Sequence, residues 1–337
     1  MALEYPFSEL PPPGATLQVA PGVHWLRMPL PFQLDHINLW LLEDEGSWTI
    51  VDTGIGNDQT RGLWEPVLGE KKARRIIVTH YHPDHAGNAA WLCERLGAEL
   101  WMTQGEYLTA HAVREAVAGY TAEAVLAVFG RNGLDEERRR GMASGRNRYA
   151  QLVPAFPHSY RRVIDGDRVR VAGREWRAIV GYGHAPEHLS LYCPQLDVLI
   201  AGDMLLSTIS TNVSVWSIDP EGDPLRLFLE SLARYRELPE SVLVLPSHGR
   251  PFRGAHARVA ELERHHAERF GELLQALRGG ARSAGELLGV LFRRPLDAHQ
   301  TFFAMGEAIA HLHYLYYAGR ASRSLGTDGI MRYATTS

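Results

Sequence analysis

The sequence lacks the features that would place the protein outside the cell or in a membrane. Its 337 residues include only two cysteines, Cys93 and Cys193, and these show no ligand spacing. We predict that they are buried thiols in a reducing compartment, one in a helix and one in a strand. No apolar run approaches transmembrane length, and Glu4 stands where a signal peptide needs apolar residues. We therefore expect a soluble cytoplasmic protein that does not bind membranes.

The chain also lacks a strong net charge. Its formal charge is -4 at pH 7, which excludes a global basic field of the kind that binds nucleic acid or a membrane surface. By contrast, 45% of the residues are hydrophobic, so the chain can bury a large core. We expect one large domain with a smaller appendage.

Histidine is concentrated in one short stretch. The chain has 16 histidines, and His80, His82 and His85 fall within six positions together with Asp84. An apolar run at 76–78 precedes the cluster and a helical pattern at 86–96 follows it, which predicts a turn at the carboxyl end of a strand. Side chains alternate along an extended segment, and Pro83 bends the chain, so His85 can join Asp84. This spacing predicts two adjacent metal pockets.

Three further apolar runs each end on a residue that can bind metal. His184 follows the strand predicted at 176–180, Asp203 follows the run at 198–202, and His248 follows the run at 242–246. Other strands are predicted at 16–19, 23–26, 37–42, 48–51, 74–79, 99–102 and 168–171. Open α/β sheets carry their sites at the carboxyl ends of strands, so these residues form a constellation with the histidine cluster.

Asp52 ends another predicted strand, before Gly54 and Gly56. One interpretation is that Asp52 only forms the turn. The other is that its carboxylate orients a histidine ligand from behind. The sequence leaves both interpretations open.

These residues carry a resemblance to a known family. The chain resembles the metallo-β-lactamase superfamily, and within it the glyoxalase II-like hydrolases, through the segments at 51–54, 80–85, 183–184, 202–203 and 247–249. The resemblance implies an α/β (α+β) fold, an αββα sandwich of two facing mixed sheets with the metals at one edge. It departs at 185–188, which read Ala-Pro-Glu-His where relatives often have Thr-Pro-Gly-His, and this affects no ligand.

The resemblance also implies a ligand set for two metal ions. The first ion is held by His80, His82 and His184, and the second by Asp84, His85 and His248. Asp203 bridges both. Two divalent ions in such a site provide a bridging hydroxide near neutral pH, and the positive site stabilises an oxyanion. Zinc fits this set best, and Fe and Mn also fit.

The expected activity is hydrolysis of a thioester, ester or lactone of a small metabolite, with Asp84 and Asp203 as catalytic residues. Asp84 is expected to shuttle a proton as well as bind metal. Two alternatives remain open: a phosphodiesterase or ribonuclease of the same fold, and an iron-dependent sulfur oxygenase. The substrate-binding residues are not identifiable from the sequence, and a homo-oligomer is compatible with it.

The remaining segments are predicted to be helical. We expect a catalytic domain at 1–255 with a helical insertion at about 105–160, in which Arg148, Tyr149, His158 and Tyr160 are candidate substrate contacts. A second domain at 256–337 is predicted to contain helices at 258–277, 283–292 and 297–318 and a hairpin at 320–333. This order resembles a small winged-helix tail. The tail has no dense basic stripe, so we expect a small-molecule substrate and no nucleic-acid partner.

Overall fold

The computed structural model describes residues 3–143 and 148–336. The chain forms two compact units. Unit 1 consists of Met1–Glu115, Asn147–Thr211 and Ser231–Val259, and unit 2 of Ala116–Arg146, Asn212–Glu230 and Ala260–Ser337. The predicted insertion at about 105–160 therefore contributes residues to both units. The division into functional domains at residue 255 stays a prediction.

Unit 1 contains a seven-stranded sheet whose strands follow one another in chain order. The strands are β1 (Thr16–Ala20), β2 (Val23–Pro29), β3 (His36–Asp44), β4 (Ser47–Val51), β5 (Ala73–Ile77), β6 (Glu99–Met102) and β7 (Arg161–Arg162). The first four form an antiparallel meander, and β4 to β7 pair in parallel. The strands predicted in this region are confirmed, although β5 ends at Ile77 and not at 79.

A five-stranded sheet completes the sandwich, in the order β12-β11-β10-β9-β8. Its strands are β8 (Arg168–Val171), β9 (Arg174–Gly181), β10 (His188–Cys193), β11 (Val198–Gly202) and β12 (Leu243–Pro246). Only β11 and β12 pair in parallel. Each sheet therefore contains both parallel and antiparallel strand pairs and is mixed, as predicted.

One buried core lies between the two sheets. Trp25 and Trp40 from the first sheet belong to one buried cluster with Trp176, Leu191 and Ile200 from the second. Burying a large apolar side chain stabilises a fold by about 1.5–3 kcal/mol, so this cluster holds the sheets together. A second buried cluster joins the other face of the seven-stranded sheet to its covering helices.

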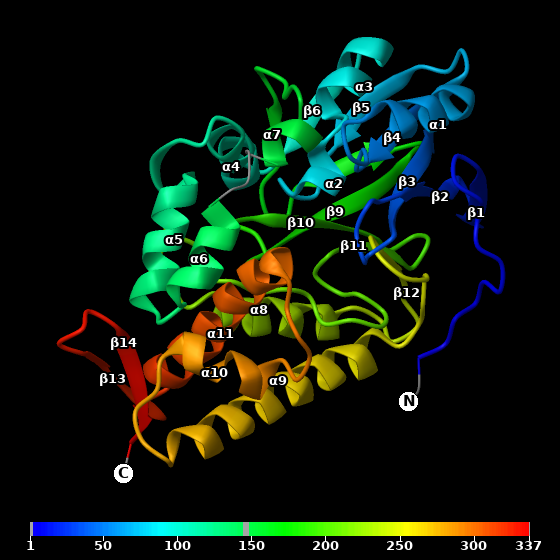
Figure 1. Cartoon of the computed structure of the whole chain (residues 1–337). Coiled ribbons are helices and arrows are strands. Elements are labelled where there is room, and N and C mark those ends of the chain that lie inside the picture. Colours follow the sequence, from blue (N-terminus) through cyan, green and yellow to red (C-terminus); the bar gives the residue numbers. More distant parts are fainter. Residues whose placement is uncertain (1–2, 144–147, 337) are drawn as a thin grey trace. The chain divides into compact units, whose positions relative to one another are not determined.

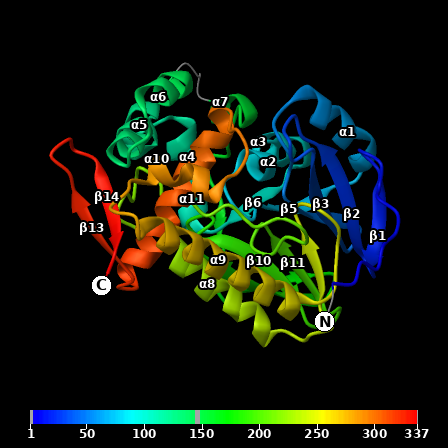
Figure 2. The same cartoon turned by 60° about the horizontal axis from the view of Figure 1, so that its bottom comes forward.

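The covering helices in unit 1 are short. They are α1 (Asp58–Leu68), α2 (Pro83–Ala86), α3 (Ala89–Leu96), α4 (Gln104–Arg114) and α7 (Arg148–Leu152), with a 3-10 turn η2 at Arg234–Glu237. Figures 1 and 2 show α1, α2 and α3 grouped on one side of the first sheet. Cys93 in α3 is partly buried, Cys193 in β10 is fully buried, and both are free thiols.

The helix predicted at 86–96 is confirmed from Ala89 to Leu96, but its start is wrong, because Ala86 belongs to α2 and Gly87 and Asn88 separate the two helices. A Cβ atom at Gly87 would lie 2.4 Å from the backbone nitrogen of Gly56. Asn88 donates from its side chain to the carbonyl oxygen of Ile55 at 2.6 Å. This close packing against the 54–56 loop interrupts the helix, and no local pattern indicates it.

The strand directions bring their carboxyl ends to one edge of unit 1. Strands β4, β5 and β6 run in parallel, and β9 and β11 run in the same direction because both are antiparallel to β10. Backbone hydrogen bonds join the two sheets at this edge, from Leu189 N to Thr79 O at 2.8 Å and from Asn38 N to Ser247 O at 2.7 Å. Every predicted metal ligand follows a strand that ends here.

Unit 2 is mainly helical. It contains η1 (Ala118–Tyr120), α5 (Ala122–Arg131), α6 (Glu136–Ala143), most of α8 (Pro224–Ala233) and α9 (Ala255–Leu277), α10 (Ala284–Leu291), α11 (Ala298–Tyr317), β13 (Ala321–Leu325) and β14 (Met331–Thr335). The capping boxes predicted at Ser283 and Asp297 are both present. The predicted hairpin is confirmed, with Leu325 paired to Met331. The likeness to a winged helix stays a prediction.

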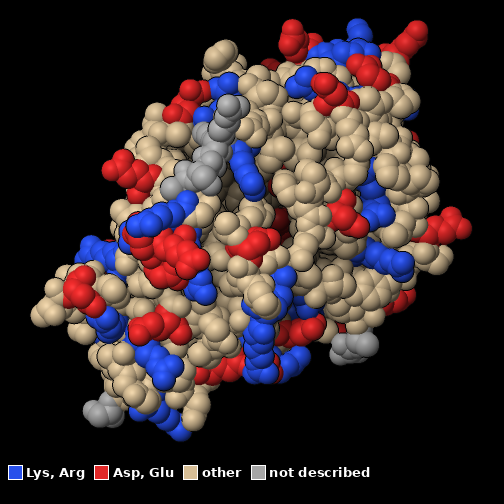
Figure 3. All heavy atoms as spheres, in the orientation of Figure 1, with Lys and Arg blue, Asp and Glu red and all other residues tan. Residues whose placement is uncertain are grey.

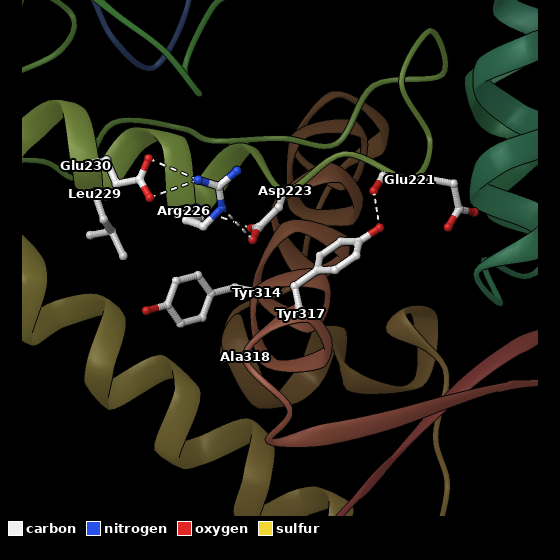
Figure 4. A pocket seen from close by; sticks show the side chains of 8 residues that line it. All are labelled: Glu221, Asp223, Arg226, Leu229, Glu230, Tyr314, Tyr317 and Ala318. Carbon is white, nitrogen blue, oxygen red and sulfur yellow. Dashed lines mark hydrogen bonds and ion pairs between the residues drawn. The ribbon is translucent and has the colours of Figure 1, made fainter.

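A pocket of about 630 Å³ lies within unit 2 (Figure 4). Three of its charged side chains are paired with one another, and the carboxylate of Glu221 pairs with Arg323 at 2.6 Å. Arg226 donates to both carboxylate oxygens of Glu230 at 2.8 and 3.0 Å and lies 3.5 Å from a carboxylate oxygen of Asp223. Tyr317 donates to the carbonyl oxygen of Glu221 at 2.5 Å. Because these groups satisfy one another, we assign no ligand to this pocket.

Two buried histidines of unit 2 form a hydrogen-bonded chain. His311 Nδ1 donates to the carbonyl oxygen of Glu307 at 2.8 Å, so its Nε2 can only accept, and His266 Nδ1 lies 3.1 Å from it. Burial is the main reason that the pKa falls to about 3 for His266 and about 4 for His311, and the neighbouring charge on His265 lowers both further. Both rings are therefore neutral at pH 7.

Acid is expected to destabilise the protein through this pair. Between about pH 4 and 6.5 the unfolded chain binds protons on these histidines and the folded chain does not, so stability falls as pH decreases through this range. Each histidine contributes a slope of about 1.4 kcal/mol per pH unit. The measurement is the pH dependence of the unfolding free energy of the wild type and of His266→Gln, with ring titration by NMR. The variant should show a shallower slope, and titration of both rings near pH 6.5 would contradict the prediction.

Among the described residues, no helix combines the length and the apolar character needed to cross a bilayer.

Candidate metal centre

The histidine cluster follows β5 directly and forms the turn into α2. Pro83 occupies the first position of α2, where its missing N–H costs nothing. The extended segment up to His82 therefore bends at Pro83, and Asp84 and His85 enter the short helix. This is the bend predicted from the sequence, and it places the cluster at the edge where the two sheets meet.

The first group of ligands combines this turn with residues from the second sheet. His80, His82, His184 and Asp203 offer ligand atoms that all lie within 4.8 Å of one another. His80 Nε2 lies 2.9 Å from His82 Nδ1 and 3.2 Å from His184 Nε2. These nitrogens therefore converge from segments 104 residues apart in the chain.

The second group consists of Asp84, His85 and His248. Asp84 Oδ2 lies 3.6 Å from His85 Nε2 and 3.3 Å from His248 Nε2. Asp203 links the two groups, because its Oδ1 lies 3.5 Å from both His85 Nε2 and His248 Nε2, while its Oδ2 lies 3.5 Å from His184 Nε2. All seven predicted ligands thus lie together, in the two sets expected. Their role as ligands stays a prediction.

Asp52 lies behind the second group and is fully buried. Its Oδ2 lies 2.8 Å from His85 Nδ1, and its Oδ1 accepts from Thr79 N at 2.8 Å. Asp52 also has a φ of 63°, which asparagine and aspartate tolerate better than most residues. The left-handed backbone at Asp52 fits the first interpretation and the contact with His85 fits the second, and the role of Asp52 stays a prediction.

Two imidazoles of the first group, those of His80 and His82, are held neutral. Burial, followed by the charges of neighbouring histidines, lowers the pKa of His80 well below its usual value. For His82, burial and the charge of His184 lower the pKa to about 3. A neutral ring keeps a lone pair for a metal ion, so these side chains are ready to act as ligands without losing a proton.

The second group attracts positive charge. Burial alone would lower the pKa of His85, but the carboxylates of Asp52, Asp84 and Asp203 outweigh it and raise the pKa to about 9. Burial alone would raise the pKa of Asp84, but the charges of His85 and His248 bring it to about 2. In both cases the carboxylates favour a cation at this position, whether that cation is a proton or a metal ion.

The side chains present fit divalent metal ions. His85 Nε2 and Asp203 Oδ1 are buried and have no hydrogen-bond partner among the residues that the structure describes. The Nε2 atoms of His80 and His184 approach to 3.2 Å, a distance at which two lone pairs repel unless a cation or proton lies between them. Imidazole nitrogen and carboxylate oxygen are ligands of zinc, iron and manganese. The arrangement points to divalent metals without deciding which.

Sequence reasoning missed several residues that support this centre. His188 is fully buried, and its Nε2 accepts from the backbone nitrogen of Asp203 at 3.1 Å. Gly202 allows this contact, because a Cβ there would lie 2.4 Å from the His188 ring. The carbonyl oxygen of His36 accepts from His248 Nδ1 at 2.8 Å, which turns Nε2 toward the carboxylates. The histidine four positions after His184 was a signal in the sequence, whereas His36 gave none.

Among the candidate contacts in the predicted insertion, Tyr149 reaches the cluster. Its hydroxyl donates to the carbonyl oxygen of Tyr81 at 2.6 Å. Arg148 and His158 are exposed. Tyr160 stacks on Tyr107 with ring centroids 3.8 Å apart. Substrate contacts by these residues stay a prediction.

Comparison with known families matches two parts of the chain. The profile of the metallo-beta-lactamase superfamily matches residues 33–248, which include every predicted ligand. The profile of a metallo-beta-lactamase-like C-terminal domain matches residues 270–336.

Solved structures extend the match to nearly the whole chain. A beta-lactamase domain protein from Burkholderia ambifaria is 47% identical, with a TM-score of 0.92 over 99% of this chain and 98% of that one. A metallo-beta-lactamase family protein from Thermus thermophilus is 33% identical, with a TM-score of 0.80 over 95% of this chain and 100% of that one. The predicted fold class is therefore confirmed.

Curated relatives are more distant. The probable metallo-hydrolase YqjP of Bacillus subtilis is 21% identical over 86% of this chain and 91% of its own length. The atrochrysone carboxyl ACP thioesterase of Aspergillus fumigatus is 22% identical over 81% of this chain and 73% of its own length. The hydroxyacylglutathione hydrolase of Cronobacter sakazakii is 25% identical over 62% of this chain and 61% of its own length. The profile match and the solved relatives agree: the chain belongs to the metallo-beta-lactamase superfamily.

Proposed function

We propose that this metal-dependent hydrolase cleaves a thioester, ester or lactone of a small metabolite with two divalent metal ions, preferably zinc. One observation carries the proposal. Asp203 presents one carboxylate oxygen to each of two ligand groups that already converge on buried points of the edge. A single metal ion would occupy only one of these two groups.

The ions supply an activated water near neutral pH and a Lewis acid for a carbonyl oxygen. The side chains have separate tasks. Asp203 holds the two ligand groups at a fixed separation, and His248 is oriented by the carbonyl oxygen of His36. The carboxylate of Asp84 takes up the proton of the attacking water. Because water is the nucleophile, the reaction needs no nucleophilic side chain.

Two of the relatives support an acyl substrate. One is named a thioesterase and the other a hydrolase of hydroxyacylglutathione. On the face shown in Figure 3, Lys and Arg side chains are interspersed with Asp and Glu, as suits a small substrate better than a polyanion. A location in the cytoplasm remains part of the proposal.

Removing the metal is expected to abolish hydrolysis. Elemental analysis of the purified protein should find close to two zinc ions per chain, and dialysis against a chelator should remove activity toward thioester, oxyester and lactone substrates. Added Zn(II) should restore it, because the ligands remain folded at the edge of the sheets. Bis(p-nitrophenyl) phosphate serves as the comparison substrate.

The same measurements distinguish the alternatives. Faster cleavage of the phosphodiester than of every acyl substrate would replace the proposal with a phosphodiesterase. A single iron ion per chain, with oxygen consumption in the presence of a thiol, would replace it with a sulfur oxygenase.

A further inference from the structure

Two segments that carry predicted ligands meet at the start of helix α4. The first is the turn at 80–85, and the second is the segment at 182–188 that follows β9. Glu106 lies in the first turn of α4 and is fully buried. Its Oε2 accepts from the backbone nitrogen of Tyr81 at 2.9 Å, and its Oε1 accepts from that of Glu187 at 2.6 Å. One carboxylate therefore holds both segments.

Glu187 strengthens the junction from the other side. Its carboxylate accepts from the backbone nitrogen of Gly105 at 2.7 Å, and its carbonyl oxygen accepts from the Thr103 hydroxyl at 2.8 Å. The first N–H groups of a helix have no partner within it and favour an anion, so Glu187 also caps α4.

The backbone of Tyr81 is held by one hydrogen bond at its nitrogen and by another at its carbonyl oxygen. Glu106 accepts from its nitrogen, and Tyr149 donates to its carbonyl oxygen at 2.6 Å. Tyr81 lies between His80 and His82, so a rotation of the Tyr81 backbone would move both histidine rings. Tyr81 is buried, so both hydrogen bonds to its backbone are made inside the protein, away from water.

We propose that Glu106 is a positioning residue that sets the separation of His80 and His82 from His184, and thereby the affinity of the first ligand group for its metal ion. The inference rests on the proposed function, because it assigns these histidines to a metal. Glu106 acts through Tyr81 and Glu187 and is not itself a ligand. Partners behind the ligands of a metal site commonly change its affinity by about 10- to 100-fold.

The alternative is that Glu106 only stabilises the fold. Asp44 provides the control, because it is equally buried and accepts from the backbone nitrogen of Ala172 and the hydroxyl of Thr49, both at 3.1 Å. It also pairs with the buried Arg75 at 3.4 Å, so its loss is expected to cost at least as much stability as the loss of Glu106. It lies beside the turn that joins β3 to β4, at the other end of β4 from Asp52. Loss of either carboxylate lowers stability, but only Glu106 contacts the ligand segments.

The test compares Glu106→Gln, Asp44→Asn and the wild type in full-length protein. Glutamine keeps the shape of the side chain but turns an NH2 group toward one of the two backbone N–H groups. The measurements are Zn(II) affinity by competition with a chelating dye, the Co(II) absorption spectrum, and the unfolding midpoint of the metal-free protein. We expect Glu106→Gln to bind the first ion about 10- to 100-fold more weakly with a changed Co(II) spectrum. Asp44→Asn should lose stability and keep both metal properties.

Tyr149→Phe gives a second test, since it removes the donor at the other end of the Tyr81 peptide with little change in volume. It should weaken Zn(II) binding in the same direction, and it keeps the inference testable if Glu106→Gln does not fold. Wild-type affinity in both variants, or an equal loss in Asp44→Asn, overturns the positioning role. A wild type that binds no Zn(II) overturns the proposed function instead.

Discussion

Replacing Asp203 by alanine is expected to lower the hydrolytic rate by about 10³-fold or more, which corresponds to about 4 kcal/mol of transition-state stabilisation. The carboxylate oxygens of Asp203 lie within 4.0 Å of ring nitrogens from both groups, with Oδ2 facing His80 and His184 and Oδ1 facing His85 and His248. Without it, the two groups lose their common carboxylate, and the site loses one of its two negative charges. The measurement is kcat/KM on the best acyl substrate, together with metal content.

Metal content should fall along with activity in this variant, because five neutral imidazoles and one carboxylate hold two divalent ions poorly. Asp203→Asn is the matched variant: it keeps the volume and loses the charge, so it should also lose metal. Asp44→Asn is the control for the removal of a buried carboxylate elsewhere in unit 1. Two zinc ions and activity within tenfold of the wild type in Asp203→Ala would show that the carboxylate does not bridge.

Asp52→Asn is expected to weaken metal binding by about 10- to 100-fold without removing a ligand. The carboxylate accepts from Thr79 N and lies 2.8 Å from His85 Nδ1, which keeps the proton of the ring on Nδ1 and leaves Nε2 for a metal ion. An asparagine must turn its NH2 group toward one of these donors. The ring can then move its proton to Nε2, where it blocks the second ligand group.

The measurement for Asp52→Asn is Zn(II) affinity with the kinetics of hydrolysis at saturating Zn(II). Excess metal should restore part of the activity, since all seven ligands remain. The buried mismatch should also cost about 1–3 kcal/mol of stability. Asp44→Asn separates the two effects, because it removes a buried carboxylate that accepts from Ala172 N and from the Thr49 hydroxyl, at the other end of β4 from Asp52. If Asp44→Asn weakens Zn(II) binding as much as Asp52→Asn does, the tautomer argument fails.

Much of the site could be predicted because its ligands follow short patterns. The spacing of His80, His82, Asp84 and His85 after an apolar run is visible in the sequence, and so are the single ligands after three other runs. The helices of unit 2 were predictable for a similar reason, since the capping boxes at Ser283 and Asp297 involve residues three positions apart. The helix predicted at 86–96 begins only at Ala89, because packing against a distant loop interrupts the local pattern.

Two residues behind the predicted ligands, Glu106 and His36, were not predictable, unlike Asp52. An acidic residue in the first turn of a helix is ordinary, so Glu106 looked like any helix start. Its partners lie 25 and 81 positions away along the chain. His36 likewise acts through a backbone carbonyl on a residue 212 positions away. Neither relation leaves a trace in spacing or composition.

The kinds of ligand, their order along the chain and their placement after strands follow from the sequence, because side-chain alternation, strand runs and turn residues act over a few positions. The pairing of His80 with His184, the bridging position of Asp203 and the junction at Glu106 depend on the tertiary structure. They arise because strand directions and register in two separate sheets bring carboxyl ends to one edge, and register is set by packing between distant segments.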